Sequence, residues 1–249
     1  MCIDTAEMAA ETFDNKRVAF YECDYLERMK LSEVLKLASE LAGYDYTAKG
    51  FSHEFLWERD MVFLVSRVSF KLHAYPTSYD ELVSSTWEKG RKGALFMRGF
   101  EVKKADGTLL IEGESAWVLV SPTTRRIHRP SAFKYKMPMI TDRSYGGIPS
   151  GKIEYGNAVP VGTHTVTISE LDANGHLYNG NYADIAADIF SQQLFEMSVE
   201  NFRINFISEA KLGDTIELCF CDEGERAVVI GSVDGKCCFE AEFVFKSQE

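Results

Sequence analysis

The chain has 249 residues, 45% hydrophobic and 26% charged, a composition typical of a globular protein long enough to bury one large core or two smaller ones. No apolar run approaches the roughly 20 residues that a membrane-spanning helix needs, so we expect no membrane span. The net charge of −11 argues against a nucleic-acid partner, because binding phosphates requires a basic surface.

The first part of the chain predicts a strand, a helix and four further strands. Alternation indicates a strand over residues 18–25. Helical spacing is seen for the apolar residues Val34, Leu35, Ala38, Leu41 and Ala42. Ser32 is the candidate N-cap of this helix and Gly43 its stop. Runs rich in Val, Phe, Leu and Trp then predict strands over 62–72, 81–88, 94–103 and 108–120.

A proline-rich stretch separates this part from the rest. Five of the six prolines fall in residues 122–160, and so long a connection is more reasonable between two domains than inside one.

Beyond the linker the same order of elements recurs. We expect a strand over 164–171, a helix from 182 to about 195 by its periodicity, and strands over 201–207, 215–221, 227–233 and 237–246. The last hairpin of each part has an Asp-Gly turn, Asp106-Gly107 and Asp234-Gly235. Two copies of one unit indicate an α+β fold in which a long helix is wrapped by an antiparallel sheet, twice.

A polar cluster stands between the first strand and the helix of the second copy. If residues 172–176 are extended, Asp172, Asn174 and His176 project from one face. Asn181 is then the expected N-cap of the helix, whose free N–H groups favour negative charge. The alternative is a simple turn, because Asp, Asn and Gly are preferred in turns for backbone reasons.

These residues resemble the catalytic segment of the acyl-acyl-carrier-protein thioesterases of plants and bacteria. The likeness extends to residues 205–214, which resemble the segment with a further catalytic glutamate, and to Thr86-Trp87, residues 117–119 and residues 124–126. The resemblance implies two tandem hotdog units: an N-terminal unit over 1–121 with the acyl-chain cavity, a linker over 122–161, and a catalytic unit over 162–249. It also implies hydrolysis of acyl-acyl-carrier-protein thioesters in fatty acid biosynthesis, with release of free fatty acid.

By the same resemblance the catalytic residues are Asp172, Asn174, His176 and Glu209. We assign Glu209 as the general base on water and His176 as the group that polarises the water or the carbonyl. Asn174 would position the water or the oxyanion, and Asp172 would hold the others in place. Many plant members have a cysteine after the glutamate, where this chain has Ala210. The sequence also has no G-x-S-x-G motif, so neither a cysteine nor a serine nucleophile is expected.

The charge is unevenly distributed. Residues 141–249 hold 7 Lys and Arg against 18 Asp and Glu, whereas the first 140 residues hold 20 of each. One basic cluster lies in a stretch without acids: Arg125, Arg126, Arg129, Lys134 and Lys136. It is either a solvated linker or a docking patch for acyl carrier protein, which the resemblance implies as an acidic partner.

The matching region of the first copy, residues 23–28, has no Asp, Asn and His triplet. One active site per chain follows. Because the chain already contains two units, we expect a monomer or a homodimer.

Three alternatives remain open. An acyl-CoA thioesterase would use the same chemistry with another carrier. A double-hotdog hydratase or dehydratase would resemble Asp-x-Asn-Pro-x-His, and the proline and the additional residue are absent. A catalytically inactive acyl-binding module is the third.

The N-terminus and the cysteines bear on the compartment. The first residues contain acids where a signal peptide has bases, so nothing suggests export, and we expect a cytoplasmic protein. The six cysteines are Cys2, Cys23, Cys219, Cys221, Cys237 and Cys238. They lack the C-x-x-C spacing of a zinc site and fit reduced thiols; metal binding by the last four is a remote alternative. We expect no cofactor and no metal.

Overall fold

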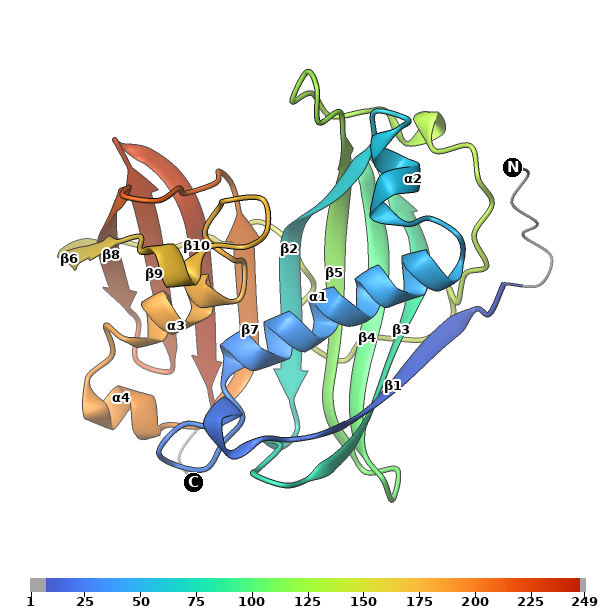
Figure 1. The fold of residues 1–249 in the computed structure, drawn as a ribbon. Coiled ribbons are helices and arrows are strands. Elements are labelled where there is room, and N and C mark those ends of the chain that lie inside the picture. The colour runs from blue at the N-terminus through green and yellow to red at the C-terminus, as the bar shows by residue number, and fades with distance from the viewer. Residues whose placement is uncertain (1–7, 247–249) are drawn as a thin grey trace.

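One antiparallel sheet of ten strands runs through the chain, which a computed structural model describes over residues 8–246 (Figure 1). The strands are β1 (Glu11–Arg17), β2 (Val62–Leu72), β3 (Glu81–Lys92), β4 (Leu95–Lys104), β5 (Leu109–Val120), β6 (Val159–Thr165), β7 (Val199–Phe206), β8 (Thr215–Asp222), β9 (Arg226–Val233) and β10 (Lys236–Phe245). The helices are α1 (Leu31–Ala48), α2 (His53–Trp57), α3 (Asn181–Ala187) and α4 (Gln192–Glu196), with the short 3₁₀ helices η1 (Phe20–Glu22), η2 (Pro130–Ala132) and η3 (Ile168–Glu170).

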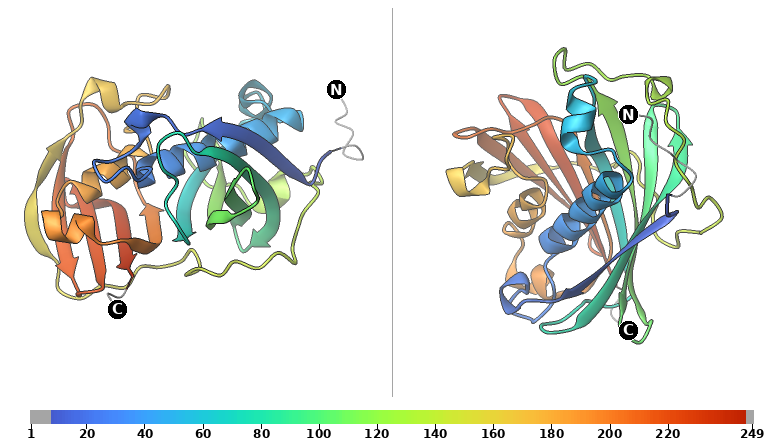
Figure 2. Two further views of the ribbon diagram at one scale, coloured as in Figure 1. Left: turned by 90° about the horizontal axis from the view of Figure 1, so that it is seen from below. Right: turned by 45° about the vertical axis from the view of Figure 1, so that its right-hand side comes forward.

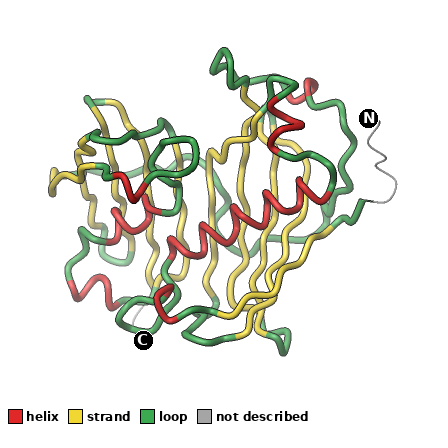
Figure 3. The backbone as a smooth tube through the Cα atoms, in the orientation of Figure 1, coloured by secondary structure: helices red, strands yellow, loops and turns green. Residues whose placement is uncertain are grey.

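The strand order repeats between the two halves of the sheet. The order is β1-β3-β4-β5-β2 followed by β7-β10-β9-β8-β6, so each half has the same neighbours and the second half is reversed. The halves meet where β2 pairs with β7, from Arg67 opposite Asn205 to Lys71 opposite Asn201. The strands are yellow in Figure 3, and the red helices lie on one side of them.

Helix α1 crosses the strands of the first half, and α3 and α4 cross those of the second (Figures 1 and 2). The apolar face predicted for α1 is confirmed, since Val34, Leu35 and Leu41 are all buried. The predicted helix bounds are wrong: α1 begins at Leu31 and runs through Gly43 to Ala48. Its extra turns are held by buried polar contacts that hydrophobic periodicity cannot detect.

Two of the predicted strands are misplaced. Residues 18–25 form η1 and a turn, while the first strand is the preceding segment Glu11–Arg17. In the second half β6 ends at Thr165, so only residues 164–165 of the strand predicted over 164–171 are in β6, and residues 168–170 form η3. Both true strands lie at the edges of the sheet and are polar or exposed, which weakens the apolar alternation used to find strands. The other eight strands are confirmed within a few residues of their bounds.

The predicted second helix is also interrupted. α3 ends at Ala187, and α4 begins after Ser191, whose hydroxyl caps it by accepting the Leu194 N–H at 3.2 Å. Asn181 is the first helical residue of α3 and Gly180 is its N-cap, so the predicted cap is wrong by one residue.

The proline-rich segment between β5 and β6 contains no α-helix or strand and only η2. It passes along the face of the sheet opposite the helices (Figure 2). There it covers the junction of the halves: Ser69 on β2 hydrogen-bonds Tyr145 (2.7 Å), and Asn205 on β7 donates to the Gly151 carbonyl oxygen (3.1 Å). One hydrophobic core extends through both halves. No helix among residues 8–246 is long and apolar enough to cross a membrane.

Candidate active site

Residues 171–177 form a closed loop and not the predicted extended segment. The Asp172 N–H donates to the His176 carbonyl oxygen (2.8 Å), and a bridge joins the two ends of the loop. The Asp172 carboxylate accepts the N–H groups of Asn174 (2.8 Å) and His176 (3.2 Å), an arrangement that competes with strand pairing. Gly175 supplies the positive φ of 78° that the loop needs. The extended prediction is wrong and the alternative of a turn is correct.

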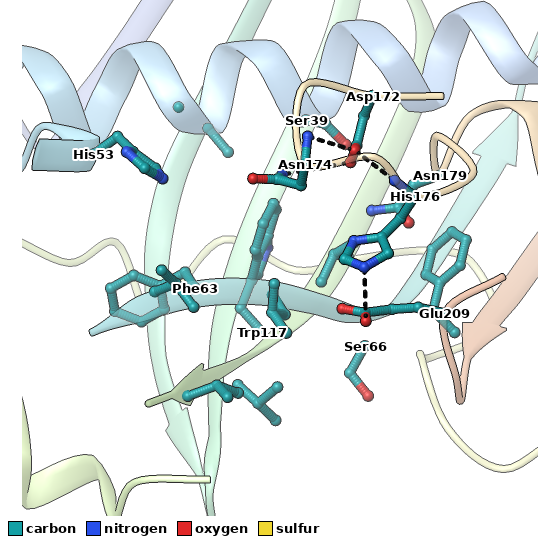
Figure 4. A pocket seen from close by; sticks show the side chains of 18 of the residues that line it. Ser39, His53, Phe63, Ser66, Trp117, Asp172, Asn174, His176, Asn179 and Glu209 are labelled. Atoms are coloured by element: carbon teal, nitrogen blue, oxygen red, sulfur yellow. Dashed lines mark hydrogen bonds and ion pairs between the residues drawn. The ribbon is translucent and has the colours of Figure 1, made fainter. Parts of the chain in front are cut away.

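The loop still brings the three polar side chains to one space, since Asp172, Asn174 and His176 all line the same cavity. Figure 4 shows Asn174 and His176 directed into the region between α1 and β2. The Asp172 carboxylate in addition accepts backbone N–H groups of the loop. The geometry therefore gives Asp172 a role in holding the loop, whereas Asn174 and His176 face the cavity.

Glu209 comes from the connection between β7 and β8 and meets His176. The His176 Nε2 lies 3.2 Å from Glu209 Oε2 (Figure 4). The two segments are joined by the Leu177 N–H, which donates to the Ala210 carbonyl oxygen (2.9 Å), and by a bridge between His176 and Lys211. Both side chains are partly exposed, His176 at 21% and Glu209 at 31%, so water can reach the pair.

Tyr182 on α3 fixes the residue after Glu209. Its hydroxyl oxygen accepts the Ala210 N–H at 3.1 Å, and burial raises the pKa of Tyr182 to about 12, so the hydroxyl stays protonated at neutral pH. Ala210 is itself fully buried. The position where many plant relatives have a thiol therefore carries a methyl group packed in the core.

A cavity of about 910 Å³ opens beside the His176 and Glu209 pair. Its mouth is polar, with Asn174, His176, Asn179 and Glu209 among the lining residues. From there it passes Trp117 toward Phe63 and His53, between α1 and the sheet (Figure 4). Apolar lining from the first half includes Phe51, Leu56, Phe63, Phe96, Trp117 and Val120. Such a cavity suits an alkyl chain whose polar end stays at the mouth.

The cavity also reaches two buried charges. Glu88 and Arg98 line it and are 5% and 3% exposed, with the Arg98 guanidinium 2.6 Å from Glu88 and 2.8 Å from Asp45. Burial alone would raise the pKa of the Asp45 carboxyl, but Arg98 and Lys49 outweigh it and hold this pKa below its ordinary value. The charges are thus paired with one another and hold α1 to β3 and β4.

No cysteine is among the residues that line the cavity within the described range 8–246. Cys238 lies in the core at 1% exposure, and burial raises the pKa of its thiol. In the same part of the chain no three His, Cys, Asp or Glu side chains are grouped so that they could hold a metal ion.

The basic residues of the linker divide into two kinds. The Arg125 guanidinium contacts the Glu209 carboxylate directly, although the side chain is 60% exposed. The others, Arg126, Arg129, Lys134 and Lys136, are exposed and make no ion pair with any residue between 8 and 246. The structure thus brings one member of the predicted basic cluster into the site and leaves the rest at the surface.

The active-site loop has a counterpart in the first half with the same backbone contacts. The Asp24 carboxylate accepts the N–H groups of Leu26 and Arg28, and a bridge closes that loop as well. The Met29 N–H donates to the Pro76 carbonyl oxygen, as the Leu177 N–H does to Ala210. Arg28 consequently occupies the place of His176, and the residue before Pro76 occupies the place of Glu209.

That counterpart has no acid–base pair. The residue opposite Arg28 is Tyr75, with the guanidinium carbon 5.0 Å from its ring centroid. Arg28 also donates to the carbonyl oxygens of Phe195 (2.9 Å) and Met197 (3.2 Å), beside α4. The carboxylate and the imidazole of the second half are thus replaced in the first half by the phenol of Tyr75 and the guanidinium of Arg28. Of the two repeated loops in the described chain, only the second is a candidate active site.

Several contributors were not predicted from the sequence. Tyr182 was expected only as the start of the second helix, and no functional role was predicted for Asn179; both line the cavity. Ser39 on α1 lines the mouth without any local sequence signal. The contact of Arg125 with Glu209 joins residues 84 positions apart, which composition and spacing cannot reveal.

Comparisons with known proteins find a family model and solved structures that resemble this chain. Residues 10–131 match the family model of the acyl-ACP thioesterase N-terminal domain. An acyl-ACP thioesterase from Bacteroides thetaiotaomicron has a similar structure, with a TM-score of 0.86, 21% identity, and coverage of 95% of this chain and 98% of that chain. The 12:0-ACP thioesterase from Umbellularia californica is similar at a TM-score of 0.76 and 17% identity, covering 96% and 98%.

The structure is also similar to that of a protein from another reaction class. A MaoC-like dehydratase has a TM-score of 0.66 and 13% identity, covering 98% of this chain and 99% of that chain. At these identities the structures show a shared fold, and a fold alone does not fix the reaction. No curated protein sequence matches this chain significantly.

Proposed function

Because the chain belongs to the acyl-ACP thioesterase family and is a thioester hydrolase, we propose that it cleaves acyl groups from acyl carrier protein and releases free fatty acid. The observation that carries the proposal is the His176 and Glu209 pair at the polar mouth of an otherwise largely apolar cavity. The apolar part would hold the alkyl chain and leave the thioester carbonyl beside the pair.

In the proposed mechanism water attacks the thioester directly. Glu209 takes a proton from the attacking water as the new C–O bond forms, and the carbonyl oxygen becomes an oxyanion. Glu209 Oε1 has no hydrogen-bond partner in the described chain, whereas Oε2 is held by His176 and Arg125, so Oε1 is the free acceptor. Collapse of the intermediate breaks the C–S bond, and the proton passes to the leaving thiolate.

Asn174 and His176 would act on the oxygen atoms of the reaction. The Asn174 amide faces the cavity and can donate to the oxyanion or orient the water. His176, whose side chain also lines the cavity, can polarise the water or the carbonyl. Asp172 acts through the loop, as its backbone contacts indicate.

We further propose that the two halves are tandem hotdog units. The N-terminal unit would span 1–121 and supply most of the cavity wall, and the C-terminal unit would span 162–249 and supply the polar residues, with 122–161 as linker. The repeated strand order and the repeated Asp24 and Asp172 loops support this division.

The proposal also specifies the carrier of the acyl group, which is acyl carrier protein. Arg126, Arg129, Lys134 and Lys136 on the linker are exposed and form no ion pair with residues 8–246, which suits contact with an acidic protein surface, and long-range attraction of this kind raises association rates. A cytoplasmic role in fatty acid synthesis would accompany that carrier.

The rival carrier is coenzyme A, because the bond broken is identical. Thiol release should be compared for one acyl chain on acyl carrier protein and on coenzyme A, at low and moderate salt. We expect a higher kcat/KM for the carrier protein, with an advantage that shrinks as salt rises. Equal or better turnover of the coenzyme A thioester at every salt concentration would overturn the assignment of the carrier.

A further inference from the structure

Arg125 is joined to the reaction centre by the same oxygen atom as His176. Its Nη2 contacts Glu209 Oε2, and His176 Nε2 lies 3.2 Å from that oxygen. Two groups from different segments thus hold one carboxylate oxygen. The other carboxylate oxygen of Glu209, Oε1, is then free to face the cavity. Glu209 and Arg125 both line this cavity.

The loop that presents Arg125 is tied down at its base by Asp60. The Asp60 carboxylate accepts the Ser121 hydroxyl (2.6 Å) and the Thr123 N–H (3.2 Å), and these hydrogen bonds lower the pKa of its carboxyl. The Asp60 carbonyl oxygen is also 2.7 Å from His128 Nε2. Asp60 thus anchors the loop both before and after Arg125. The position of the loop backbone therefore brings Arg125 close to Glu209.

The backbone of this region is held in a conformation that side chains usually avoid. Arg125 has a φ of 59° and Asp60 a φ of 56°, both in the left-handed region. For a residue other than glycine this costs about 1–2 kcal/mol, and it persists only where surrounding contacts determine it. Here the Arg125 N–H donates to the Ser121 carbonyl oxygen at 2.8 Å. Such strain is characteristic of functional positions.

No other cation in the described chain duplicates Arg125. The salt-bridge partners of Glu209 within residues 8–246 are Arg125 and His176, and the adjacent Lys211 makes no ion pair with Glu209. Tyr182 on α3 keeps its proton. A guanidinium is always charged and offers fixed donors, so it can orient a carboxylate at every working pH.

We propose that Arg125 is a positioning residue for catalysis, which sets the Glu209 carboxylate so that its free oxygen faces the attacking water. The proposal rests on the proposed function, in which Glu209 is the base. It separates Arg125 from the neighbouring cations, whose expected role is contact with the carrier. Loss of Arg125 should therefore lower kcat on every thioester, including those without a carrier protein.

The test uses a short acyl-pantetheine thioester, which has no carrier surface to dock. Arg125→Gln should lower kcat about 10- to 100-fold with KM within about threefold, the scale expected when a catalytic group is misplaced. Arg125→Lys should recover kcat only in part, since lysine keeps the charge but lacks the planar fork.

The matched control is Arg17→Gln. Arg17 is also an exposed arginine paired with a glutamate, 3.5 Å from Glu81, and both are 65% exposed on the sheet edge. The Arg17→Gln variant should match the wild type in kcat and in the pH profile of the reaction. Thermal melting of each variant shows whether a loss of activity comes from unfolding.

A second measurement asks whether Arg125 acts through Glu209. In a Glu209→Gln background, Arg125→Gln should cost less than about twofold more, because coupled residues are not additive. An equal loss in both backgrounds, or unchanged kcat for Arg125→Gln alone, would overturn the proposal.

A readout independent of turnover keeps the proposal testable. The His176 ring-proton chemical shifts in NMR spectra should change in Arg125→Gln and stay fixed in Arg17→Gln, and unchanged shifts in both would count against the proposal. Failure of the carrier assignment would instead appear as coenzyme A preference in the wild type, so the two failures are distinguishable.

Discussion

Glu209→Gln removes the basicity of the proposed base while keeping the size and shape of its side chain. The carboxylate receives both the His176 imidazole and the Arg125 guanidinium on one oxygen. A neutral amide can still accept from one of them through its carbonyl oxygen. It cannot take a proton from water at neutral pH, so the reaction loses its general base.

The expected magnitudes separate a chemical effect from a structural one. A positioned base supplies about 10²- to 10⁴-fold, which is about 2.7–5.4 kcal/mol of barrier at 1.36 kcal/mol for each factor of ten. The Glu209 side chain is 31% exposed and its Arg125 partner 60% exposed. Exposed ion pairs of this kind contribute about 0–1 kcal/mol, so the melting temperature should fall by no more than about 4 °C for a chain of this size.

The assay follows thiol release from a saturating acyl-pantetheine thioester at pH 7, together with thermal melting of the same preparation. We expect a loss of kcat of at least about 10²-fold with a nearly unchanged melting temperature. A kcat within threefold of the wild type would refute Glu209 as the base. Direct attack by water would also be refuted by an acyl group found on a cysteine in intact-protein mass spectra of the wild type during turnover.

Three further predictions test the surroundings of this pair. Asn174→Ala should lower kcat by about 10²-fold or more with little change in stability, as for the loss of one oxyanion donor, and near-normal turnover would return Asn174 to a purely turn-forming role. Reversing Arg126 and Arg129 to Glu should raise KM for acyl carrier protein at low salt and leave pantetheine thioesters unaffected; an equal loss on both would remove the docking role. Arg98→Met should destabilise the fold by about 3–5 kcal/mol in urea unfolding, because the buried Glu88 carboxylate loses its ion-pair partner and Asp45 keeps only Lys49, and a change under about 1 kcal/mol would mean that the ion pairs of Arg98 do not stabilise the fold.

The central strands were predictable because the residues on both of their faces, and the turns between them, produce a recognisable sequence pattern. The predicted strand over 62–72 coincides with β2, which pairs with β5 along its length and with β7 over residues 67–71. The edge strand β1 has the sequence Glu-Thr-Phe-Asp-Asn-Lys-Arg and carries no comparable apolar run. Its position is determined by pairing with β3, which the local sequence does not encode.

The helix end was mispredicted for a different reason. Gly43 is a common stop signal, yet the next turn of α1 contains Asp45, which accepts the Thr12 hydroxyl at 2.6 Å and pairs with Lys49 at 2.5 Å. These contacts continue the helix on a polar buried face. A glycine in a helix costs about 1 kcal/mol, which contacts of this strength offset.

The site residues were identifiable only in part from their types. Asp172, Asn174 and His176 were singled out as polar groups in step along an extended strand, whereas a turn brings them to the lining of one cavity. The predicted grouping thus arises from a different geometry, because a turn held by a carboxylate can bring the residues at i+2 and i+4 to one side as well. Glu209 depended on family resemblance, and nothing in the sequence connected it to Arg125.

The two copies of the loop explain how one backbone supports both an active and an inactive position. Asp24 and Asp172 make the same hydrogen bonds, so an aspartate at this place is a requirement of the loop and does not by itself indicate catalysis. The difference lies in the pair across the gap, Arg28 with Tyr75 in one half and His176 with Glu209 in the other. Only the second pair combines a carboxylate, which can accept a proton from water, with an imidazole. The proposed reaction is therefore argued from that pair, whereas the fold, which a dehydratase shares, cannot assign a reaction.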